Sequence, residues 1–248
     1  MMRGLSELTK TSIKLYIREP IAAFFTLAFP TMLILIFGAI YGNAPSPIFG
    51  GLGSMDVSMP AYSALILGTI GLLSVPITTA GYRQQGVLRR FRATPMRPLT
   101  YITSDLLTNL AMTILGMALL FAVGWLLYRV QFEGNIFLLL FAVILSGLAM
   151  SSMGYLIASI ASGARVAQVI GMVIFYPMMF LSGAGMPIEF LPPSLQRVSD
   201  FLPLTYVSRL LRGLWFGEPF VDHLFEVAVL AGILVVFGGL AARFFRWE

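Results

Sequence analysis

The feature that most constrains the fold is a series of six long apolar stretches that carry almost no charge. They cover residues 21–41, 60–81, 106–128, 136–160, 166–186 and 224–245. A helix needs about 20 apolar residues to cross the hydrocarbon core of a bilayer, where it satisfies its own backbone hydrogen bonds. The sequence therefore predicts an all-α polytopic membrane protein with six transmembrane helices, forming a single domain over residues 1–248.

Composition agrees with this class and excludes several kinds of site. Hydrophobic residues make up 58% of the chain and charged residues 11%. In soluble domains about half of the residues are hydrophobic and about a quarter are charged. The chain has no cysteine and one histidine, His223, which excludes disulfides, thiolate metal sites and histidine-rich metal clusters. The first 20 residues are too polar for the core of a cleaved signal peptide, so we interpret the first apolar stretch as a retained anchor.

Basic residues are distributed unevenly among the connections between the apolar stretches. If the N-terminus is cytoplasmic, only four of the 16 Lys and Arg residues lie outside: Arg129, Arg197, Arg209 and Arg212. Cytoplasmic loops of membrane proteins carry an excess of Lys and Arg. We therefore predict that both termini are cytoplasmic. This asymmetry also explains the pI of about 9.7 without a nucleic-acid partner.

Residues 3–19 have the pattern of an amphipathic helix on the inner membrane surface. Four basic residues fall within one quadrant of a helical projection: Arg3, Lys10, Lys14 and Arg18. Apolar residues lie opposite, as in interfacial helices. The alternative is an ordinary basic flank of the first transmembrane helix.

The outer connection over residues 187–222 mixes prolines, aromatic residues and leucines. Its prolines predict two short helices, roughly Pro193 to Phe201 and Leu204 to Leu214. We expect both helices at the outer interface, with Tyr206, Trp215 and Phe216 as anchors at the level of the lipid headgroups.

No source of energy is recognisable within the chain. The only lysines, Lys10 and Lys14, lie outside any phosphate-binding loop. The middles of the six stretches lack ionisable residues, which disfavours ion coupling. Asp105 at the inner mouth of the third helix fits a helix cap, with a substrate or proton role as the alternative. Ser182 fits a packing role better than a nucleophile, since no base is available at membrane depth.

These observations predict neither catalytic residues nor a metal site, so we expect a transport subunit rather than an enzyme.

A basic segment joins the second and third apolar stretches. It reads "GYRQQGVLRRFRATPMRPL" and holds five arginines, each of which would cost about 2.5–3.5 kcal/mol at the bilayer centre. The segment must therefore be cytoplasmic. Val87, Leu88 and Phe91 form an apolar ridge, and Pro95 ends the short helix that we predict over residues 83–95. It either transmits motion from a partner or only fixes the topology.

Two motifs resemble the permease subunits of type-2 ATP-binding-cassette (ABC) exporters. Members of this family export polysaccharides, lipids, or drugs such as daunorubicin. One motif is "GVLRRFRATPMRPLTYI" at residues 86–102, and the other is "FLSGAGMPIEFLPPSLQRVSDFLPLTYVSRLLRG" at residues 180–213. The acidic residues that many relatives carry before the first glycine are replaced here by Tyr82, Arg83, Gln84 and Gln85.

The resemblance implies a complex of two permease subunits and two cytoplasmic ABC ATPase subunits, with ATP and Mg²⁺ bound by the ATPases. A homodimer of permeases is favoured over a heterodimer. The segment before Pro95 would be the coupling helix that contacts the ATPase. Its expected residues are Arg83, Gly86, Leu88, Arg89, Arg90, Phe91, Arg92 and Pro95.

Substrate contacts are expected on two helices and in the outer segment. Hydroxyl, methionine and aromatic side chains suggest a pathway along Ser74, Thr78, Met172, Phe175, Tyr176, Met179 and Phe180, with simple helix packing as the alternative. The motif of the outer segment comprises Pro203, Leu204, Thr205, Tyr206, Arg209 and Arg212.

The resulting expectation is an ATP-driven exporter of amphipathic drugs or lipid-like molecules in a bacterial or archaeal plasma membrane. The alternatives are export of a lipid-linked polysaccharide or glycolipid by the same architecture, and an ion-coupled secondary transporter.

Replacing Phe91 or Arg90 is expected to reduce co-purification of the ATPase or to uncouple ATP hydrolysis from transport, because both residues belong to the predicted contact. Membrane insertion should be unchanged. Normal coupled transport after disruption of the whole face from Leu88 to Arg92 would contradict the assignment of the coupling helix.

Overall fold

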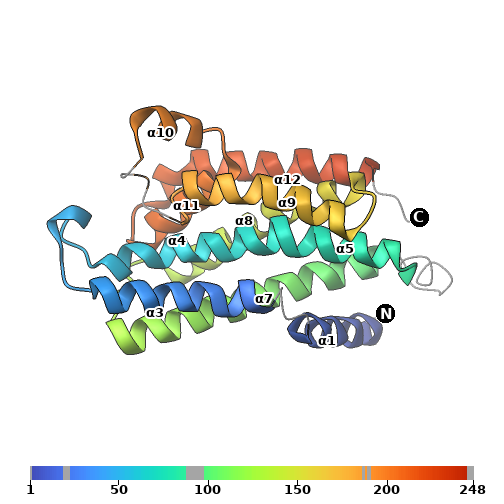
Figure 1. Ribbon diagram of the computed structural model, residues 1–248, viewed down its shortest axis with the longest axis horizontal. Coiled ribbons are helices and arrows are strands. Elements are labelled where there is room, and N and C mark those ends of the chain that lie inside the picture. Colours follow the sequence, from blue (N-terminus) through green and yellow to red (C-terminus); the bar gives the residue numbers. More distant parts are fainter. Residues whose placement is uncertain (1, 19–22, 88–97, 186–187, 189–190, 245–248) are drawn as a thin grey trace.

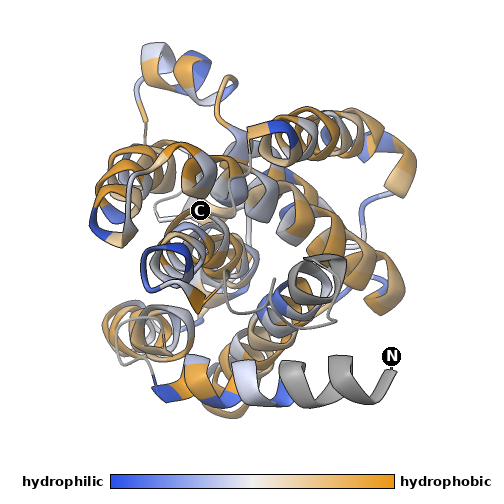
Figure 2. Ribbon diagram, turned by 90° about the vertical axis from the view of Figure 1, so that its right-hand side faces the viewer, coloured by the Kyte–Doolittle hydropathy of each residue, from blue (hydrophilic) through white to orange (hydrophobic). Residues whose placement is uncertain are grey.

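The computed structural model describes residues 2–18, 23–87, 98–185, 188 and 191–244. Every regular element in this part of the chain is helical, which confirms the predicted all-α class. Long helices run side by side along the longest axis of the molecule (Figure 1). Viewed along that axis, the helices are composed mostly of apolar residues (Figure 2), and many of their large apolar side chains are exposed, as expected for helices that contact lipid.

Five of the described helices are long and apolar enough to cross a membrane. They are Ser54–Gln84, Thr103–Tyr128, Ile136–Ile160, Ala164–Leu181 and Phe220–Phe244. The first predicted crossing corresponds to the shorter apolar helix Thr26–Tyr41. The structure therefore supports a multi-pass membrane protein. That the first apolar helix also crosses the membrane, which would make six crossings in all, remains a prediction.

The crossing helices comprise several labelled elements. The first apolar helix consists of η1 (Phe24–Ala28) and α3 (Phe29–Tyr41). The second consists of α4 (Ser54–Thr69), η3 (Ile70–Ser74) and α5 (Val75–Gln84). The others are α7 (Pro98–Tyr128), α8 (Ile136–Ile160), α9 (Ala164–Leu181), and η5 (Phe220–His223) with α12 (Leu224–Phe244).

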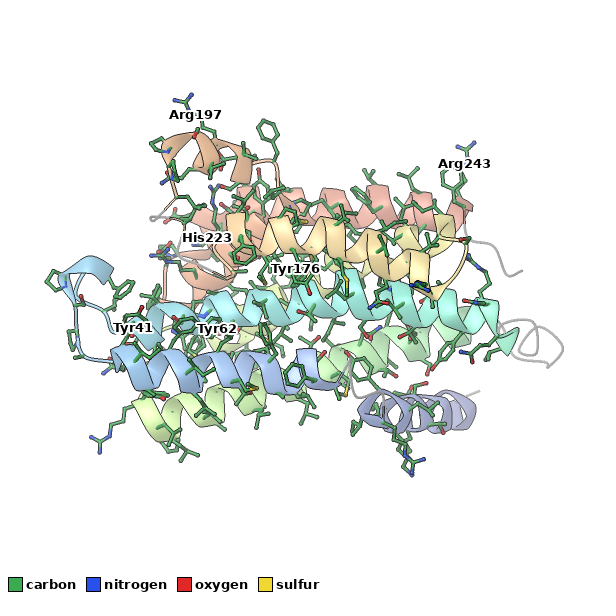
Figure 3. All side chains as sticks on the ribbon, in the orientation of Figure 1. Tyr41, Tyr62, Tyr176, Arg197, His223 and Arg243 are labelled. Carbon is green, nitrogen blue, oxygen red and sulfur yellow. The ribbon has the colours of Figure 1, made fainter. Side chains whose placement is uncertain are left out.

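Both ends of the described chain lie at the same end of the bundle (Figure 1), as expected if the termini share one side of the membrane. We call this the inner end, following the predicted orientation, and the opposite end the outer end. Arg243 and Arg197, which the charge distribution assigns to opposite sides, lie at opposite ends of the molecule (Figure 3).

The N-terminal helix α1 (Met2–Arg18) confirms the predicted helix to within one residue at each end. It lies against the inner part of α7 (Figure 1), where the hydroxyls of Thr9 and Ser104 are 3.1 Å apart. The Tyr16 hydroxyl lies 2.8 Å from the hydroxyl of Thr26 at the start of the first apolar helix. Lys10, Lys14 and Arg18 are exposed, as the amphipathic pattern predicted.

The second crossing helix begins at Ser54, six residues before the start predicted from its apolar pattern. The Asn43 side chain explains the difference, because its Oδ1 accepts hydrogen bonds from the backbone N–H groups of Met55 and Asp56 at 2.9 and 3.2 Å. A helix start needs acceptors of this kind. Here the acceptor lies twelve residues upstream and thus outside any local capping motif.

The carboxylate of Asp56 continues this outer polar cluster. It accepts hydrogen bonds from the backbone N–H groups of Gly53 and Gln131 at 3.2 and 3.0 Å and from Asn43 Nδ2 at 3.3 Å. Asn43 Nδ2 also donates to the carbonyl of Tyr128 at 3.1 Å. The cluster therefore joins the outer ends of the first, second and third apolar helices.

The two short helices predicted in the outer connection are present as α10 (Pro193–Ser199) and α11 (Pro203–Trp215). The expectation that Trp215 anchors at headgroup level is wrong, since its side chain is 4% exposed and packs between the rings of Phe121 and Phe132. One face of α11 is continuously apolar, so the helix inserts between α4, α8 and α12 and forms part of the core.

A close approach between helices brings η3 against α8. A Cβ at Gly154 would lie 2.0 Å from the carbonyl oxygen of Gly71, and a Cβ at Gly71 would lie 2.4 Å from Met150 Cβ. Glycine on both helices therefore allows backbone contact, as in other packed membrane helices.

Replacing Gly154 with alanine is expected to destabilise the protein by about 1–3 kcal/mol, because the added methyl group must push α8 away from η3. The thermal midpoint of monodisperse protein in detergent measures this effect. Gly232→Ala on α12 is the matched control, since a Cβ there meets no atom within 4 Å. Equal midpoints for the two variants would contradict the close packing.

Candidate functional site

The central helix formed by α4, η3 and α5 connects the outer end of the molecule to the predicted coupling segment. In its most apolar window 83% of the residues are buried, more than in any other described crossing helix. The π-helical turn η3 ends at Ser74, two residues before Pro76, whose missing N–H and fixed φ favour such a deviation. The inner end of this helix is therefore continuous with the most buried part of the core.

The predicted pathway residues on this helix lie in different environments. Ser74 is buried, and its hydroxyl has no hydrogen-bond partner in the described part of the chain. Thr78 is half-buried. The neighbouring Thr79 hydroxyl is also buried without a described partner. Two unpaired hydroxyls therefore flank Pro76 in the interior of the protein.

The pathway residues predicted on α9 divide between two faces. Phe175 is buried, and its ring lies against Gly68 of α4. Tyr176 and Phe180 are 38% and 54% exposed on the opposite side of the helix. Met172 and Met179 are partly buried beside the core. The exposed face continues along Val169 and Val173 with helical spacing and is available to a ligand or a second subunit.

The inner end of α5 is held to the connection between α8 and α9. Arg83 donates hydrogen bonds from Nη1 to the carbonyl of Ala158 at 2.9 Å and from Nη2 to the carbonyl of Ala161. Gln84 Oε1 accepts a hydrogen bond from the backbone N–H of Ala164 at 3.2 Å. We call these three contacts the inner clamp.

The inner clamp contains the first two residues of the predicted coupling segment, Arg83 and Gln84, which the structure places at the end of α5 and not in a separate short helix. Gly86 follows the end of α5 with φ of +69°, a conformation that favours glycine. The other predicted coupling residues, Leu88, Arg89, Arg90, Phe91, Arg92 and Pro95, lie outside the described residues. Arg83 was predicted only as part of the coupling segment, and its bond to the α8–α9 connection required the fold.

The predicted residues of the outer segment cluster on α11. Leu204 and Thr205 are fully buried, and the Thr205 hydroxyl donates to the carbonyl of Ser199 at 2.7 Å. The Tyr206 hydroxyl donates to the carbonyl of Asp200, and Arg209 forms an ion pair with the Asp200 side chain at 2.5 Å. Pro203 begins the helix.

A small outer cavity of about 70 Å³ borders Arg209 and Arg212 and lies beside Tyr62 of α4. The outer segment thus packs onto the central helix.

Asp105 differs from its prediction. It is the eighth residue of α7, so its interpretation as a helix cap is wrong. The buried carboxylate accepts hydrogen bonds from the Tyr155 hydroxyl of α8 at 2.5 Å and from Asn109 Nδ2 at 3.2 Å, both at Oδ2. Tyr155 was not predicted as a site residue, since it lies on another helix and is 50 residues from Asp105 in the chain.

Comparison with known proteins decides the family. The family model described as ABC-2 type transporter matches residues 3–216, which is most of the chain. The chain belongs to the ABC-2 type transporter family.

Curated relatives of this ABC-2 protein have modest identity. The probable multidrug ABC transporter permease YbhR of Escherichia coli K12 is 25% identical over 66% of the chain and 45% of its own length. The daunorubicin resistance ABC transporter permease protein DrrB1 of Streptomyces coeruleorubidus is 26% identical over 65% of the chain and 58% of its own length.

A third relative is the capsule polysaccharide export inner-membrane protein CtrC of Neisseria meningitidis, 27% identical over 49% of the chain and 45% of its own length. The chain thus spans about half the length of these curated relatives.

Arg83→Ala is expected to loosen the inner clamp, because the two carbonyls at the end of α8 lose a charged donor worth about 1.5–3 kcal/mol. Hydrogen–deuterium exchange should accelerate roughly tenfold or more at the backbone amides that follow Ala158. Arg243→Ala is the control, since it removes an exposed arginine from the same end of the bundle. Unchanged exchange in Arg83→Ala would contradict the clamp.

Proposed function

We propose that this ABC-2 protein is the membrane subunit of an ATP-driven exporter that moves amphipathic drugs or lipid-like molecules outward. Two cytoplasmic ABC ATPase subunits bind ATP and Mg²⁺, and two copies of the chain form the membrane part. The family match and the permease names of the relatives support this proposal.

The observation that carries the mechanism is the inner clamp. Because Arg83 bonds both Ala158 and Ala161, a push on the segment that follows α5 moves the central helix and the α8–α9 connection together. The exposed stripe on α9 lies directly beyond this connection. ATP-driven closure of the ATPase pair would thus change the faces that the two permease copies present to each other.

Export of a lipid-linked polysaccharide is a second candidate, favoured by the similarity to the capsule polysaccharide protein CtrC. An ion-coupled carrier that acts alone is a third, favoured by the buried carboxylate of Asp105. The three candidates differ in their need for an ATPase and in the size of the transported molecule.

Co-expression with candidate ABC ATPases, followed by purification through a tag on this chain, tests the proposal. We expect a stable complex whose ATP hydrolysis is stimulated severalfold by amphipathic drugs or phospholipids. Stimulation by glycolipids alone would favour the polysaccharide candidate. Transport by vesicles that contain only this chain, abolished by a proton or sodium ionophore, would overturn the ATP-driven mechanism.

Arg83→Ala provides a second test in the same complex. It should lower substrate-stimulated hydrolysis several-fold and leave ATPase co-purification intact, because the clamp lies on the permease side of the contact. Arg243→Ala should behave like the wild type. Full stimulation in Arg83→Ala would show that the clamp takes no part in coupling.

A further inference from the structure

A crevice of about 210 Å³ lies between α7 and α8, with the central helix as its floor. A water molecule needs about 10–15 Å³ by this measure, so the space accommodates a ligand segment of many atoms. Leucine and isoleucine side chains form most of its walls. The polar residues at its lining are Thr103, Asn109, Thr113 and Ser151.

The crevice opens on the side of the bundle. Leu107 at its lining is 41% exposed, and Ile144 and Leu148 on the opposite helix are half-buried. Lipid chains surround this surface in a membrane. The amphipathic helix α1 contacts the same part of α7 through Thr9 and Ser104, which places the crevice at the level of the inner leaflet.

Asp105 lies next to this crevice, connected to it by Asn109. Asn109 lines the crevice and donates its amide N–H to Asp105 Oδ2. Tyr155 donates to the same oxygen, so within the described chain no hydrogen bond reaches Oδ1. Asp105 retains 9% of its surface accessible. Oδ1 is thus an acceptor without a described partner, on a residue that adjoins the Asn109 wall of the crevice.

Asp105 forms no ion pair with another described residue. Ion pairs between described residues join Arg209 with Asp200, and His223 with Glu218 and Glu226, at the outer end. Burial of a carboxylate without a cation costs several kcal/mol, and charged residues within membrane helices commonly mark ligand or ion pathways. A cationic ligand would supply the missing charge.

We propose that the crevice between α7 and α8 binds amphiphiles that carry a protonated amine. The apolar body lies between the leucines of α7 and α8, and the ammonium group donates a hydrogen bond to Asp105 Oδ1. The inference rests on the proposed export function, for which it names cationic amphiphiles of the inner leaflet as a substrate class.

The chemistry of the crevice favours an amine over a neutral or anionic amphiphile. An ammonium group forms both a hydrogen bond and an ion pair with the carboxylate, whereas an alcohol of equal length donates a hydrogen bond without bringing an opposite charge. An anionic headgroup would be repelled by Asp105. The apolar walls contribute equally to the binding of amine and alcohol, so the difference between the two reports on the carboxylate.

Equilibrium binding to the full chain in phosphatidylcholine nanodiscs tests the site without an ATPase. The probes are 12-(dansylamino)dodecylamine and 12-(dansylamino)dodecanol, which differ only in the terminal group. By fluorescence anisotropy we expect the amine to bind at least tenfold more tightly than the alcohol. Equal affinities in the wild type would overturn the proposal whatever the variants do.

Asp105→Asn keeps the size and an acceptor oxygen of the side chain and should remove the preference for the amine, with a much smaller change in the affinity for the alcohol. Leu148→Trp should weaken both probes, because the indole fills the crevice. Asp222→Asn is the control, since it removes an exposed carboxylate at the outer end. Retained amine preference in Asp105→Asn would refute the role of the carboxylate.

The outcome separates this site from the proposed function. Amine-selective binding without stimulation of an ATPase would keep the site and overturn the exporter. Stimulated hydrolysis by amines that persists in Asp105→Asn would keep the exporter and overturn the site.

Discussion

The packing of the central helix is the constraint on which the rest of the structure depends. Within its most apolar window 83% of the residues are buried, against 11% in the last crossing helix, so the other helices are arranged around it. Contact at Gly71 and Gly154 allows α8 to approach one side, and Gly68 allows Phe175 of α9 to approach another. Membrane helices gain little from hydrophobic association with one another, so this close packing is what positions them.

The elements with strong local patterns could be predicted from the sequence, and those that depend on distant contacts could not. Long apolar runs and prolines identified the helices, including α10 and α11, because these signals act within a few residues. The start of the second crossing helix was missed because Asn43, which accepts hydrogen bonds from its first N–H groups, is remote in the chain. Trp215 was misplaced because the apolar face of α11 inserts into the core instead of contacting the headgroups.

The candidate site shows the same division. The five arginines of the basic segment identified its side of the membrane through charge alone. The bond between Arg83 and the α8–α9 connection required the three-dimensional fold, since the partners are 75 and 78 residues away and are backbone carbonyls. Asp105 looked like a cap because its neighbours Ser104, Thr108 and Asn109 are typical of helix ends, yet the helix starts earlier.

The polar cluster of Asn43 and Asp56 has a mechanical consequence. It fastens the outer ends of three helices to one another, whereas the segment predicted to receive force from an ATPase follows the opposite end of the central helix. A helix that is held at its outer end and displaced at its inner end rotates about the held end, so the displacement of its residues grows with their distance from that end. If the proposed coupling holds, small shifts near Asp56 would therefore accompany larger ones near Arg83, so the inner end of the bundle would change shape more than the outer end.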